Sequence, residues 1–445
     1  MNSLEGKKYN IITFGCQMNE HDSETISGML REMGCEEVFS KEESDITIIN
    51  TCSIRENADK RFFGTLGQLK KLKEKNPDYI ACVCGCMMQQ QHIIDTVKQK
   101  YPWVDIIFGT HNIHRFPALL ENVYNEKQKV LEILEDREEI VEGLPAKRLY
   151  RHKAFVNIMY GCNNFCTYCI VPYTRGREKS RRPEDIIDEV KRLVADDVKE
   201  VTLLGQNVNS YRGERYDGST CDFSDLIYML NDIEGLERIR FMTSHPKDLS
   251  DKLIQAFADC DKLCNYIHLP VQAGSSRVLK RMNRKYTREQ YLELVRKLRT
   301  AVPDITISTD IIVGFPGETE EDFEETLSLV KEVHYDSAFT FLYSVRKGTP
   351  AAEYEEQIPE DVKHERFNRL VDIINEGSAV KNAQYVGRVE KVLVEGISKK
   401  NDDTLTGRTE GFKLVDFEGD RGLIGSIVDV EITQGKTFSL TGRIK

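Results

Sequence analysis

Short apolar runs alternate with segments of helical periodicity along most of this 445-residue chain. In the first part of the chain, the runs YNIITF, DITIIN, YIACVCG and VDIIFG are separated by helical segments near residues 21–33, 56–75 and 89–100. Such alternation predicts a mostly parallel sheet, because parallel strands need a crossover that a helix usually supplies. We therefore expect an α/β domain over residues 1–145, ending in a linker at 142–147.

A second series of apolar runs follows: FVNIM, EVTLLG, RIRFMT, YIHLPV, ITISTDIIV and AFTFLY. A plausible helix follows each run, and residues 183–197 and 319–333 show clear helical spacing of apolar side chains. Six βα units predict a partial (βα)6 barrel resembling a TIM barrel over residues 146–380. Active sites of such barrels lie at the carboxyl ends of the strands.

The last part of the chain changes in character. The runs RVEKVLVEG, TLTGRTEG, KLVDF, SIVDVEIT and SLTGRI read as short strands between glycine-containing turns. This pattern predicts a small, OB-like β-barrel over residues 381–445.

Composition restricts the cellular compartment in which we expect the protein. About 40% of the residues are hydrophobic and 30% are charged, which is ordinary for a globular protein in water. We find no run of 18 apolar residues, and the first ten residues lack the apolar core of a secretory signal. We therefore expect a cytoplasmic protein with no membrane partner. In a reducing cytoplasm its twelve cysteines indicate metal or redox chemistry rather than disulfides.

The net charge of −11 excludes a protein that is basic all over, but a local basic patch can still bind nucleic acid. The stretch RGREKSRRP, residues 175–183, is such a patch. Charge alone fits a solvated loop equally well; beside a site that meets RNA, contact with phosphate is the better interpretation.

The stretch YGCNNFCTYCI contains Cys162, Cys166 and Cys169, in the pattern C-x3-C-x2-C after the first strand of the predicted barrel. A structural zinc site normally has four protein ligands, and a [4Fe–4S] cluster normally has four thiolates. A cluster with three thiolates leaves one iron open to a small molecule. The alternative is a zinc loop that recruits a distant His or Cys.

A second trio, Cys16, Cys52 and Cys86, lies just past the ends of three predicted strands of the first domain. Parallel strands end at one edge of a sheet, where ligands collect, so these cysteines can converge on one site. The other cysteines are expected to be small buried apolar residues: Cys35, Cys82, Cys84, Cys221, Cys260 and Cys264.

The third member of this trio has two competitors, because ACVCGCMM offers Cys82, Cys84 and Cys86 at alternate positions. In a strand all three side chains would lie on the same face, so the direction of the side chain does not show which cysteine is the ligand. A cluster at the carboxyl edge needs the thiolate nearest the strand end, where Gly85 lets the backbone turn. This favours Cys86.

The C-x3-C-x2-C loop at the start of a (βα) barrel resembles that of the radical S-adenosylmethionine superfamily. The resemblance implies that the open iron binds the amino and carboxylate groups of S-adenosylmethionine. It also implies that an electron from the cluster cleaves the sulfonium to give a 5′-deoxyadenosyl radical.

The resemblance extends over essentially the whole chain. The Gly-Cys pairs at Cys16 and Cys86 and the Asn-Thr-Cys triplet at Cys52 resemble the N-terminal domain of the methylthiotransferases, where three cysteines bind an auxiliary [4Fe–4S] cluster. The tail resembles the TRAM module of RNA-modifying enzymes. Within this subfamily, GCQMNEHDSE, NTCSIRE and LLGQNVNSY resemble the branch that acts on isopentenylated tRNA.

By the same resemblance, strand ends of the barrel line the S-adenosylmethionine pocket. Gln206 lies where the superfamily often has the acid of a Gly-Glu pair. Gln272 follows the fourth strand, and Ser308 and Asp310 lie on the fifth. For Asp310 and Glu318 the alternative is a helix cap or a turn.

The resemblance implies a tRNA methylthiotransferase that adds a 2-methylthio group to C2 of N6-isopentenyladenosine next to the anticodon. It implies two [4Fe–4S] clusters, S-adenosylmethionine, a tRNA substrate and a low-potential electron donor such as flavodoxin or ferredoxin. Three alternatives stay open: methylthiolation of a ribosomal-protein aspartate, methylthiolation of threonylcarbamoyl adenosine in tRNA, and a non-catalytic zinc or iron–sulfur RNA-binding protein. The predicted cluster ligands are Cys16, Cys52, Cys86, Cys162, Cys166 and Cys169.

Overall fold

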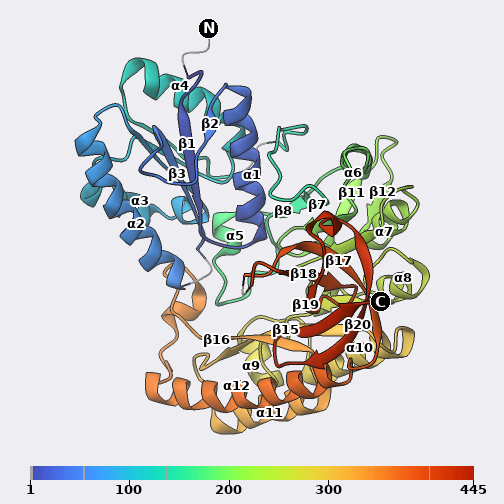
Figure 1. Ribbon diagram of the computed structural model, residues 1–445. Coiled ribbons are helices and arrows are strands. Elements are labelled where there is room, and N and C mark those ends of the chain that lie inside the picture. Colours follow the sequence, from blue (N-terminus) through green and yellow to red (C-terminus); the bar gives the residue numbers. More distant parts are fainter. Residues whose placement is uncertain (1–3, 54–55, 137–138, 400) are drawn as a thin grey trace. The chain divides into compact units, whose positions relative to one another are not determined.

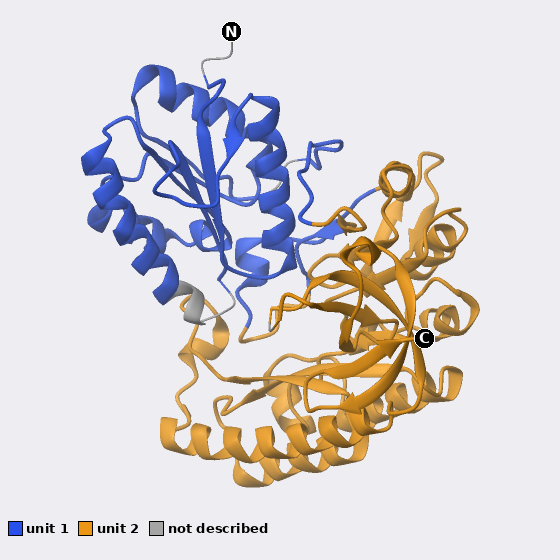
Figure 2. Cartoon of the chain, in the orientation of Figure 1, with its two compact units in different colours: residues 1–149, 159–163, 169–181 blue, residues 150–158, 164–168, 182–445 orange. Residues whose placement is uncertain are grey.

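The computed structural model divides into two compact units, coloured separately in Figure 2. It describes residues 4–53, 56–136, 139–399 and 401–445. Ile54 and Arg55 of the NTCSIRE motif lie outside these residues. Unit 1 comprises residues 1–149, 159–163 and 169–181; unit 2 comprises residues 150–158, 164–168 and 182–445.

Unit 1 contains the parallel sheet predicted from the sequence (Figure 1). Its six strands lie in the order β2-β1-β3-β4-β5-β6, and every neighbouring pair is parallel. The two edge strands, β2 and β6, were not predicted, because neither has an apolar run of strand length. The strands are β1 (Lys8–Thr13), β2 (Glu36–Glu37), β3 (Ile46–Thr51), β4 (Ile80–Gly85), β5 (Ile106–Phe108) and β6 (Val130–Glu132).

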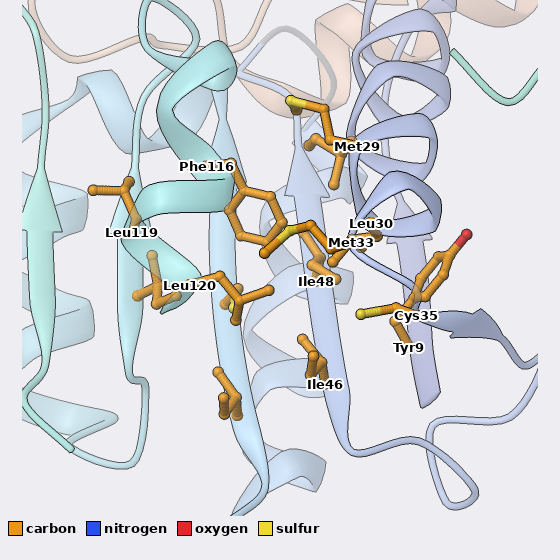
Figure 3. Packing of buried hydrophobic residues seen from close by; sticks show 14 of the residues in the cluster. Tyr9, Met29, Leu30, Met33, Cys35, Ile46, Ile48, Phe116, Leu119 and Leu120 are labelled. Carbon is orange, nitrogen blue, oxygen red and sulfur yellow. The ribbon is translucent and has the colours of Figure 1, made fainter. Parts of the chain in front are cut away.

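Two layers of helices bury the sheet. Side chains of α1 and α4 form one apolar cluster with it, and side chains of α2 and α3 form another. Figure 3 shows Met29 of α1 and Phe116 of α4 in the first cluster with Ile48 of β3. The helices are α1 (Gln17–Glu32), α2 (Glu56–Lys75), α3 (Gln91–Lys100) and α4 (Phe116–Glu126), with short 3-10 turns η1 (Cys86–Gln89) and η2 (Ile113–Arg115).

The predicted linker is packed against unit 1. The Lys147 amide donates a hydrogen bond to the Glu24 carbonyl at 2.9 Å. A Cβ atom added to Gly28 of α1 would lie 2.5 Å from the Pro145 backbone, so this helix position has room only for glycine. The later pieces of unit 1 are β8 (Met159–Tyr160), α5 (Val171–Thr174) and β9 (Lys179–Ser180).

Unit 2 begins with the predicted partial barrel of six parallel strands, called the central barrel below. Its sheets have the orders β7-β10-β13 and β14-β15-β16, and a parallel bridge between Ile239 and Leu263 links them. The strands are β7 (Lys153–Asn157), β10 (Glu200–Leu204), β13 (Arg238–Phe241), β14 (Tyr266–His268), β15 (Thr306–Val313) and β16 (Ser337–Leu342).

Helices separate these strands, and several have clear start signals. Thr287 and Gln290 form a capping box at α10, and Thr319 and Asp322 form one at α11.

No helix among the described residues is both long and apolar enough to cross a membrane. The helices are α6 (Pro183–Ala195), α7 (Phe223–Asn231), α8 (Asp251–Asp259), α9 (Ser276–Arg281), α10 (Arg288–Ala301), α11 (Glu320–Val333) and α12 (Glu360–Ala383); the small elements are η3 (Val208–Ser210), β11 (Arg212–Glu214), β12 (Thr220–Asp222), η4 (Pro246–Asp248) and η5 (Pro350–Glu353).

The tail forms the predicted small β-barrel, called the C-terminal barrel below and drawn in red in Figure 1. It is closed, with the strand order β17-β18-β19-β21-β20, and it has its own apolar core. Its elements are β17 (Val389–Ile397), β18 (Thr404–Thr409), β19 (Leu414–Glu418), η6 (Arg421–Leu423), β20 (Ile427–Gly435) and β21 (Leu440–Ile444).

A buried arginine joins the two barrels of unit 2. Arg240 of β13 donates to the Glu200 carboxylate of β10 at 2.8 Å. The same guanidinium donates to the carbonyls of Thr409 and Glu410 in the C-terminal barrel at 2.7 and 2.8 Å. A buried charge needs such complete pairing, so the C-terminal barrel supplies bonds that the central barrel lacks.

Two further contacts extend this joint. Arg238, at the start of β13, donates to the carbonyls of Arg408 and Lys391 at 2.9 and 2.8 Å. The ring of Phe412, in the β18–β19 turn, stacks on Tyr266 at the start of β14, with 4.7 Å between centroids. These contacts lie at the amino-terminal ends of the central-barrel strands, so the C-terminal barrel closes the end of the central barrel opposite the expected active site.

We predict that Arg240→Ala lowers the free energy of unfolding by about 3–5 kcal/mol, because Glu200 loses its closest charge partner inside the protein. Urea unfolding measures the change. Arg443→Ala is the matched control: its exposed pair with Glu431 on the same unit is worth less than about 1 kcal/mol. Equal losses in the two variants would contradict the role of the buried joint.

Candidate functional site

The cysteines of the second trio lie at one edge of the unit 1 sheet. Cys16 precedes the first residue of α1 shortly after β1, Cys52 directly follows β3, and Cys86 directly follows β4. The three strands are neighbours and parallel. Their carboxyl ends therefore share an edge, and the structure brings these three chain positions to it as predicted.

Two glycines allow the chain to pass closely at this edge. Gly15 has φ +148°, and a Cβ atom there would lie 2.8 Å from the Cβ atom of Cys52. Gly85 has φ +96°, and a Cβ atom there would lie 2.2 Å from the Thr51 carbonyl oxygen. Side chains at these positions would force the strand ends apart, so the two glycines set the spacing of the three cysteines.

Two buried asparagines fix the start of α1 against the end of β3. The Asn19 side chain donates to the Asn50 side chain at 3.0 Å and to the Thr51 carbonyl at 3.1 Å. In return, the Asn50 side chain donates to the Asn19 carbonyl at 2.9 Å. Both side chains are completely buried, so this network holds Cys16 and Cys52 in a rigid surrounding.

The cysteines differ in acidity. A hydrogen bond with Cys52 lowers the pKa of Cys16 to about 6 against the effect of burial, and the charge of Arg175 adds to the lowering. Cys16 also lies at a helix amino terminus, which favours a thiolate. Burial raises the pKa of Cys82 and of Cys84 well above that of an ordinary thiol. The thiolate form of Cys16 is therefore favoured at neutral pH, whereas burial favours the thiol form of Cys82 and Cys84.

The structure separates Cys86 from its two competitors. Cys82 and Cys84 lie within β4 and belong to the apolar cluster beneath α1 and α4. Cys86 has left the strand and begins η1, where its Sγ atom accepts a hydrogen bond from Nε of Arg175 at 3.0 Å. Burial raises the pKa of Cys86, and the Arg175 charge opposes this.

Arg175 itself is a buried cation of unit 1. It pairs with the Asp22 carboxylate of α1 at 2.9 Å, and both side chains are more than nine-tenths buried. Arg181 is also buried and forms an ion pair with Glu142. The expectation that the whole basic stretch contacts phosphate is therefore wrong for these two residues; Arg177 and Arg182 are the arginines of the stretch that are exposed.

The loop of the first trio is divided between the units. Cys162 and Cys169 belong to unit 1 and Cys166 to unit 2. In unit 1, the Cys162 amide donates to the Gly176 carbonyl at 3.1 Å. In unit 2, the Cys166 Sγ atom accepts a hydrogen bond from Arg284 at 3.3 Å. None of the three cysteines forms a disulfide.

The proposed S-adenosylmethionine residues lie at different depths. Ser308 and Asp310 share one face of β15. Ser308 is fully buried, and its hydroxyl bonds to Tyr266 at 2.7 Å and to Nδ1 of His268 at 2.8 Å. Nε2 of His268 lies 3.4 Å from the Asp310 carboxylate, which is more than one-quarter exposed. Asp310 is therefore partly accessible at this site, whereas Ser308 is enclosed and contacts His268.

Gln206 and Gln272 follow two different strands of the central barrel, β10 and β14. Gln206 follows β10 and is half-buried. Gln272 has φ +70°; its amide donates to the Asp310 carbonyl at 2.9 Å, and its carbonyl accepts from the Ile312 amide at 2.9 Å. These two hydrogen bonds to β15 thus fix the position of the Gln272 backbone.

Glu318 has a structural role, as the turn interpretation proposed. Its carboxylate accepts a hydrogen bond from the Gly314 amide at 2.8 Å and pairs with Arg366 at 3.1 Å. Burial raises the pKa of Glu318 to about 7, and these two contacts oppose the shift.

Three contacts near these sites could not be predicted from the sequence: that of Arg175 with Cys86, that of Arg284 with Cys166, and that of His268 with Ser308 and Asp310. Each contact joins residues far apart in the chain, or on neighbouring strands. His268 ends β14, and its partners Ser308 and Asp310 lie on the neighbouring strand β15. The arginines carried no local signal beyond their charge.

The part of the chain that the structure describes has no group of three or more His, Cys, Asp or Glu side chains that could hold a metal ion. A [4Fe–4S] cluster places each thiolate on a different iron, so its ligands stand farther apart than those of one ion. Three cysteines that form no disulfide lie at one sheet edge, and the pKa of one of them, Cys16, is lowered; this is a donor set that suits such a cluster.

Comparison with known families matches each part of the chain. The radical SAM superfamily matches residues 156–330, the uncharacterized protein family UPF0004 matches residues 8–109, and the TRAM domain matches residues 383–445.

Full-length relatives decide the family. A tRNA-2-methylthio-N(6)-dimethylallyladenosine synthase of Clostridium botulinum (strain Loch Maree / Type A3) is 59% identical over 97% of this chain and 96% of its own length. The synthase of Clostridium perfringens (strain 13 / Type A) is 58% identical over 100% of this chain and 99% of its own. The chain belongs to the tRNA-2-methylthio-N(6)-dimethylallyladenosine synthase family.

Solved structures support the fold assigned to this family member. The radical S-adenosylmethionine methyltransferase TsrM from Kitasatospora setae has a TM-score of 0.56 at 13% identity, covering 78% of this chain and 77% of TsrM. The radical enzyme OxsB has a TM-score of 0.52 at 14% identity, covering 84% of this chain and 56% of OxsB. At such identities the likeness concerns the fold alone.

We predict that Cys16 is alkylated at neutral pH in the metal-free protein. Because its pKa is lowered to about 6, it is a thiolate at pH 7 and becomes protonated, and unreactive, as the pH falls through 6. Timed iodoacetamide labelling with peptide mass spectrometry gives the rate at each pH. Cys84 is the control and should stay unlabelled. A rate midpoint near that of an ordinary thiol would contradict the geometry.

We predict that Cys86→Ala loses about half of the bound iron after anaerobic reconstitution, one cluster of two. Cys82→Ala and Cys84→Ala should keep the full amount, because these thiols lie in the apolar core. Iron and sulfide analysis of the three variants measures this. Full iron in Cys86→Ala together with a loss in Cys84→Ala would refute the assignment.

Proposed function

We propose that this chain is a tRNA methylthiotransferase that adds a methylthio group to C2 of N6-isopentenyladenosine, next to the anticodon. The observation that carries the proposal is the identity of 58–59% over essentially the full length to synthases of that name. The two cysteine trios support it, because each offers a cluster three cysteines that form no disulfide. The test below can report the sister reaction on threonylcarbamoyl adenosine directly; an enzyme that methylthiolates a ribosomal-protein aspartate would leave the tRNA product absent.

In this proposal each trio holds one [4Fe–4S] cluster: Cys162, Cys166 and Cys169 hold the first, and Cys16, Cys52 and Cys86 hold the second. When bound, the first cluster with S-adenosylmethionine supplies a 5′-deoxyadenosyl radical, and the second supplies the sulfur. A radical is needed because the aromatic C2–H of adenine resists acid–base chemistry.

The residues of the central barrel hold and orient S-adenosylmethionine. Asp310 offers an acceptor for its amino group, and the contact with His268 fixes the carboxylate of Asp310 on β15. The backbone of Gln272 is hydrogen-bonded to β15, which fixes the position of this residue. Gln206 offers a side-chain amide just after the end of β10. The base to be modified lies in a single-stranded loop of tRNA, so it can enter a pocket without opening a duplex.

The proposal implies a cytoplasmic location and two partners, a tRNA substrate and an electron donor. The donor is a low-potential protein such as flavodoxin or ferredoxin. We assign residues 1–145 to the auxiliary cluster, residues 146–380 to the radical chemistry and residues 381–445 to RNA binding. Removal of the last segment is a poor test of RNA binding, because it would strip Arg238 and Arg240 of the carbonyls to which they donate.

The two trios should separate function. We predict that Cys162→Ala abolishes formation of 5′-deoxyadenosine, whereas Cys16→Ala retains it and fails to transfer sulfur. Each variant is produced in a bacterial strain that lacks the modification, and tRNA nucleosides and deoxyadenosine are quantified by mass spectrometry. The wild-type chain should restore 2-methylthio-isopentenyladenosine. Restoration of a threonylcarbamoyl product instead, or equal loss of cleavage in both variants, would contradict the proposal.

An exposed aromatic residue offers a gentler test of RNA binding. Phe438, between β20 and β21 of the C-terminal barrel, is 78% exposed. Stacking of a base on such a ring is worth about 1–3 kcal/mol, so Phe438→Ala should weaken tRNA affinity by about fivefold or more. Ile424→Ala, an exposed aliphatic residue of the same barrel, is the control. Filter binding measures both, and equal affinities would exclude stacking on Phe438.

A further inference from the structure

Each cysteine trio has one member whose sulfur accepts a hydrogen bond from a buried arginine. In unit 1, Arg175 donates to Cys86 at 3.0 Å. In unit 2, Arg284 donates to Cys166 at 3.3 Å. Both guanidinium groups are more than nine-tenths buried. Arginines are rarely buried unless their charge is paired. A buried arginine nevertheless lies beside one proposed cluster ligand in each trio, and this recurrence needs an explanation.

The two arginines differ in how their charge is balanced. Arg175 pairs with the buried carboxylate of Asp22 at 2.9 Å, so the pair is neutral as a whole. The remaining bonds of Arg284 go to neutral groups, the Tyr286 hydroxyl and the Pro270 carbonyl, both at 2.9 Å. The positive charge of Arg284 is therefore left to act on Cys166, at a buried site where charge interactions are strong.

Charge and hydrogen bonds act on a cluster in a known direction. Reduction adds an electron, and the extra negative charge is stabilised by a nearby cation and by N–H groups that donate to the ligand sulfurs. Both effects raise the reduction potential. A carboxylate beside the cation offsets the charge effect and leaves only the hydrogen bond.

We propose that Arg175 and Arg284 are positioning residues that set the reduction potentials of the two clusters apart, the radical cluster at Cys166 being the easier to reduce. This inference rests on the proposed function. The donor supplies one electron at a time, and Arg284 favours its arrival on the cluster that cleaves S-adenosylmethionine. Asp22 cancels the charge of Arg175, so the sulfur-bearing cluster gains no such advantage.

The test uses full-length chains that keep one cluster each. Replacement of Cys16, Cys52 and Cys86 by Ala leaves the radical cluster, and replacement of the other trio leaves the auxiliary cluster. Arg284→Gln and Arg284→Lys are introduced into the first protein. Arg175→Gln and Asp22→Asn are introduced into the second. Iron content is checked, and redox titration is followed by electron paramagnetic resonance without tRNA.

We expect Arg284→Gln to lower the ratio of reduced to oxidised radical cluster at least tenfold at a fixed potential, a shift of about 59 mV for one electron. Arg284→Lys keeps the charge and should shift less. Arg175→Gln should change the auxiliary potential less than Arg284→Gln changes the radical one, and Asp22→Asn should raise it. Arg238→Gln, which removes a buried arginine at the amino-terminal end of the central barrel, should leave the radical potential unchanged.

Three results would overturn the inference: an unchanged radical potential in Arg284→Gln at full iron content, a shift in Arg175→Gln as large as that in Arg284→Gln, or the same shift in Arg238→Gln. Because the titration needs no tRNA, failure to modify tRNA would refute the proposed function and leave this inference standing. Failure of either protein to assemble an iron–sulfur cluster would overturn both.

Discussion

Parallel strands end at a common edge, and the chemistry available to this chain depends on that constraint. Cys16, Cys52 and Cys86 are separated by more than thirty residues each, yet β1, β3 and β4 are neighbours and deliver them to one edge. The same rule places Gln206 and Asp310 at the carboxyl side of the central barrel. Parallel topology thus brings residues that are far apart in the sequence to the same carboxyl ends of strands, once in unit 1 and once in the central barrel.

Buried guanidinium groups are the second recurring element. Arg240 ties the two barrels of unit 2 together, Arg175 reaches Cys86, and Arg284 reaches Cys166. Each is satisfied by several oxygen or sulfur acceptors, as a desolvated charge must be. Their partners differ: carboxylates neutralise the charges of Arg240 and Arg175, whereas Arg284 donates to a sulfur and to neutral oxygen atoms.

The sequence predicted what depends on periodicity. The central strands of unit 1, the six strands of the central barrel and the five of the C-terminal barrel lie where their apolar runs indicated. The edge strands β2 and β6 and the helix α4 did not stand out, because partial exposure or short length weakens the pattern.

Contacts between side chains far apart in the chain lay beyond sequence reasoning. Arg175 stood in a basic stretch that favoured contact with phosphate, and its pairing with Asp22 became visible only in the fold. Ser308 was correctly placed on its strand, but its depth followed from Tyr266 and His268 on the strand beside it.

The joint between the two barrels of unit 2 has a consequence for how its sequence can vary. Arg238 and Arg240 donate to main-chain carbonyls of the C-terminal barrel, which every amino acid possesses. Side chains at Arg408, Thr409 and Glu410 can therefore be exchanged without removing an acceptor. The outer surface of the C-terminal barrel can change in sequence while the main chain beneath it stays anchored to the central barrel, and a designer could reshape that surface in the same way.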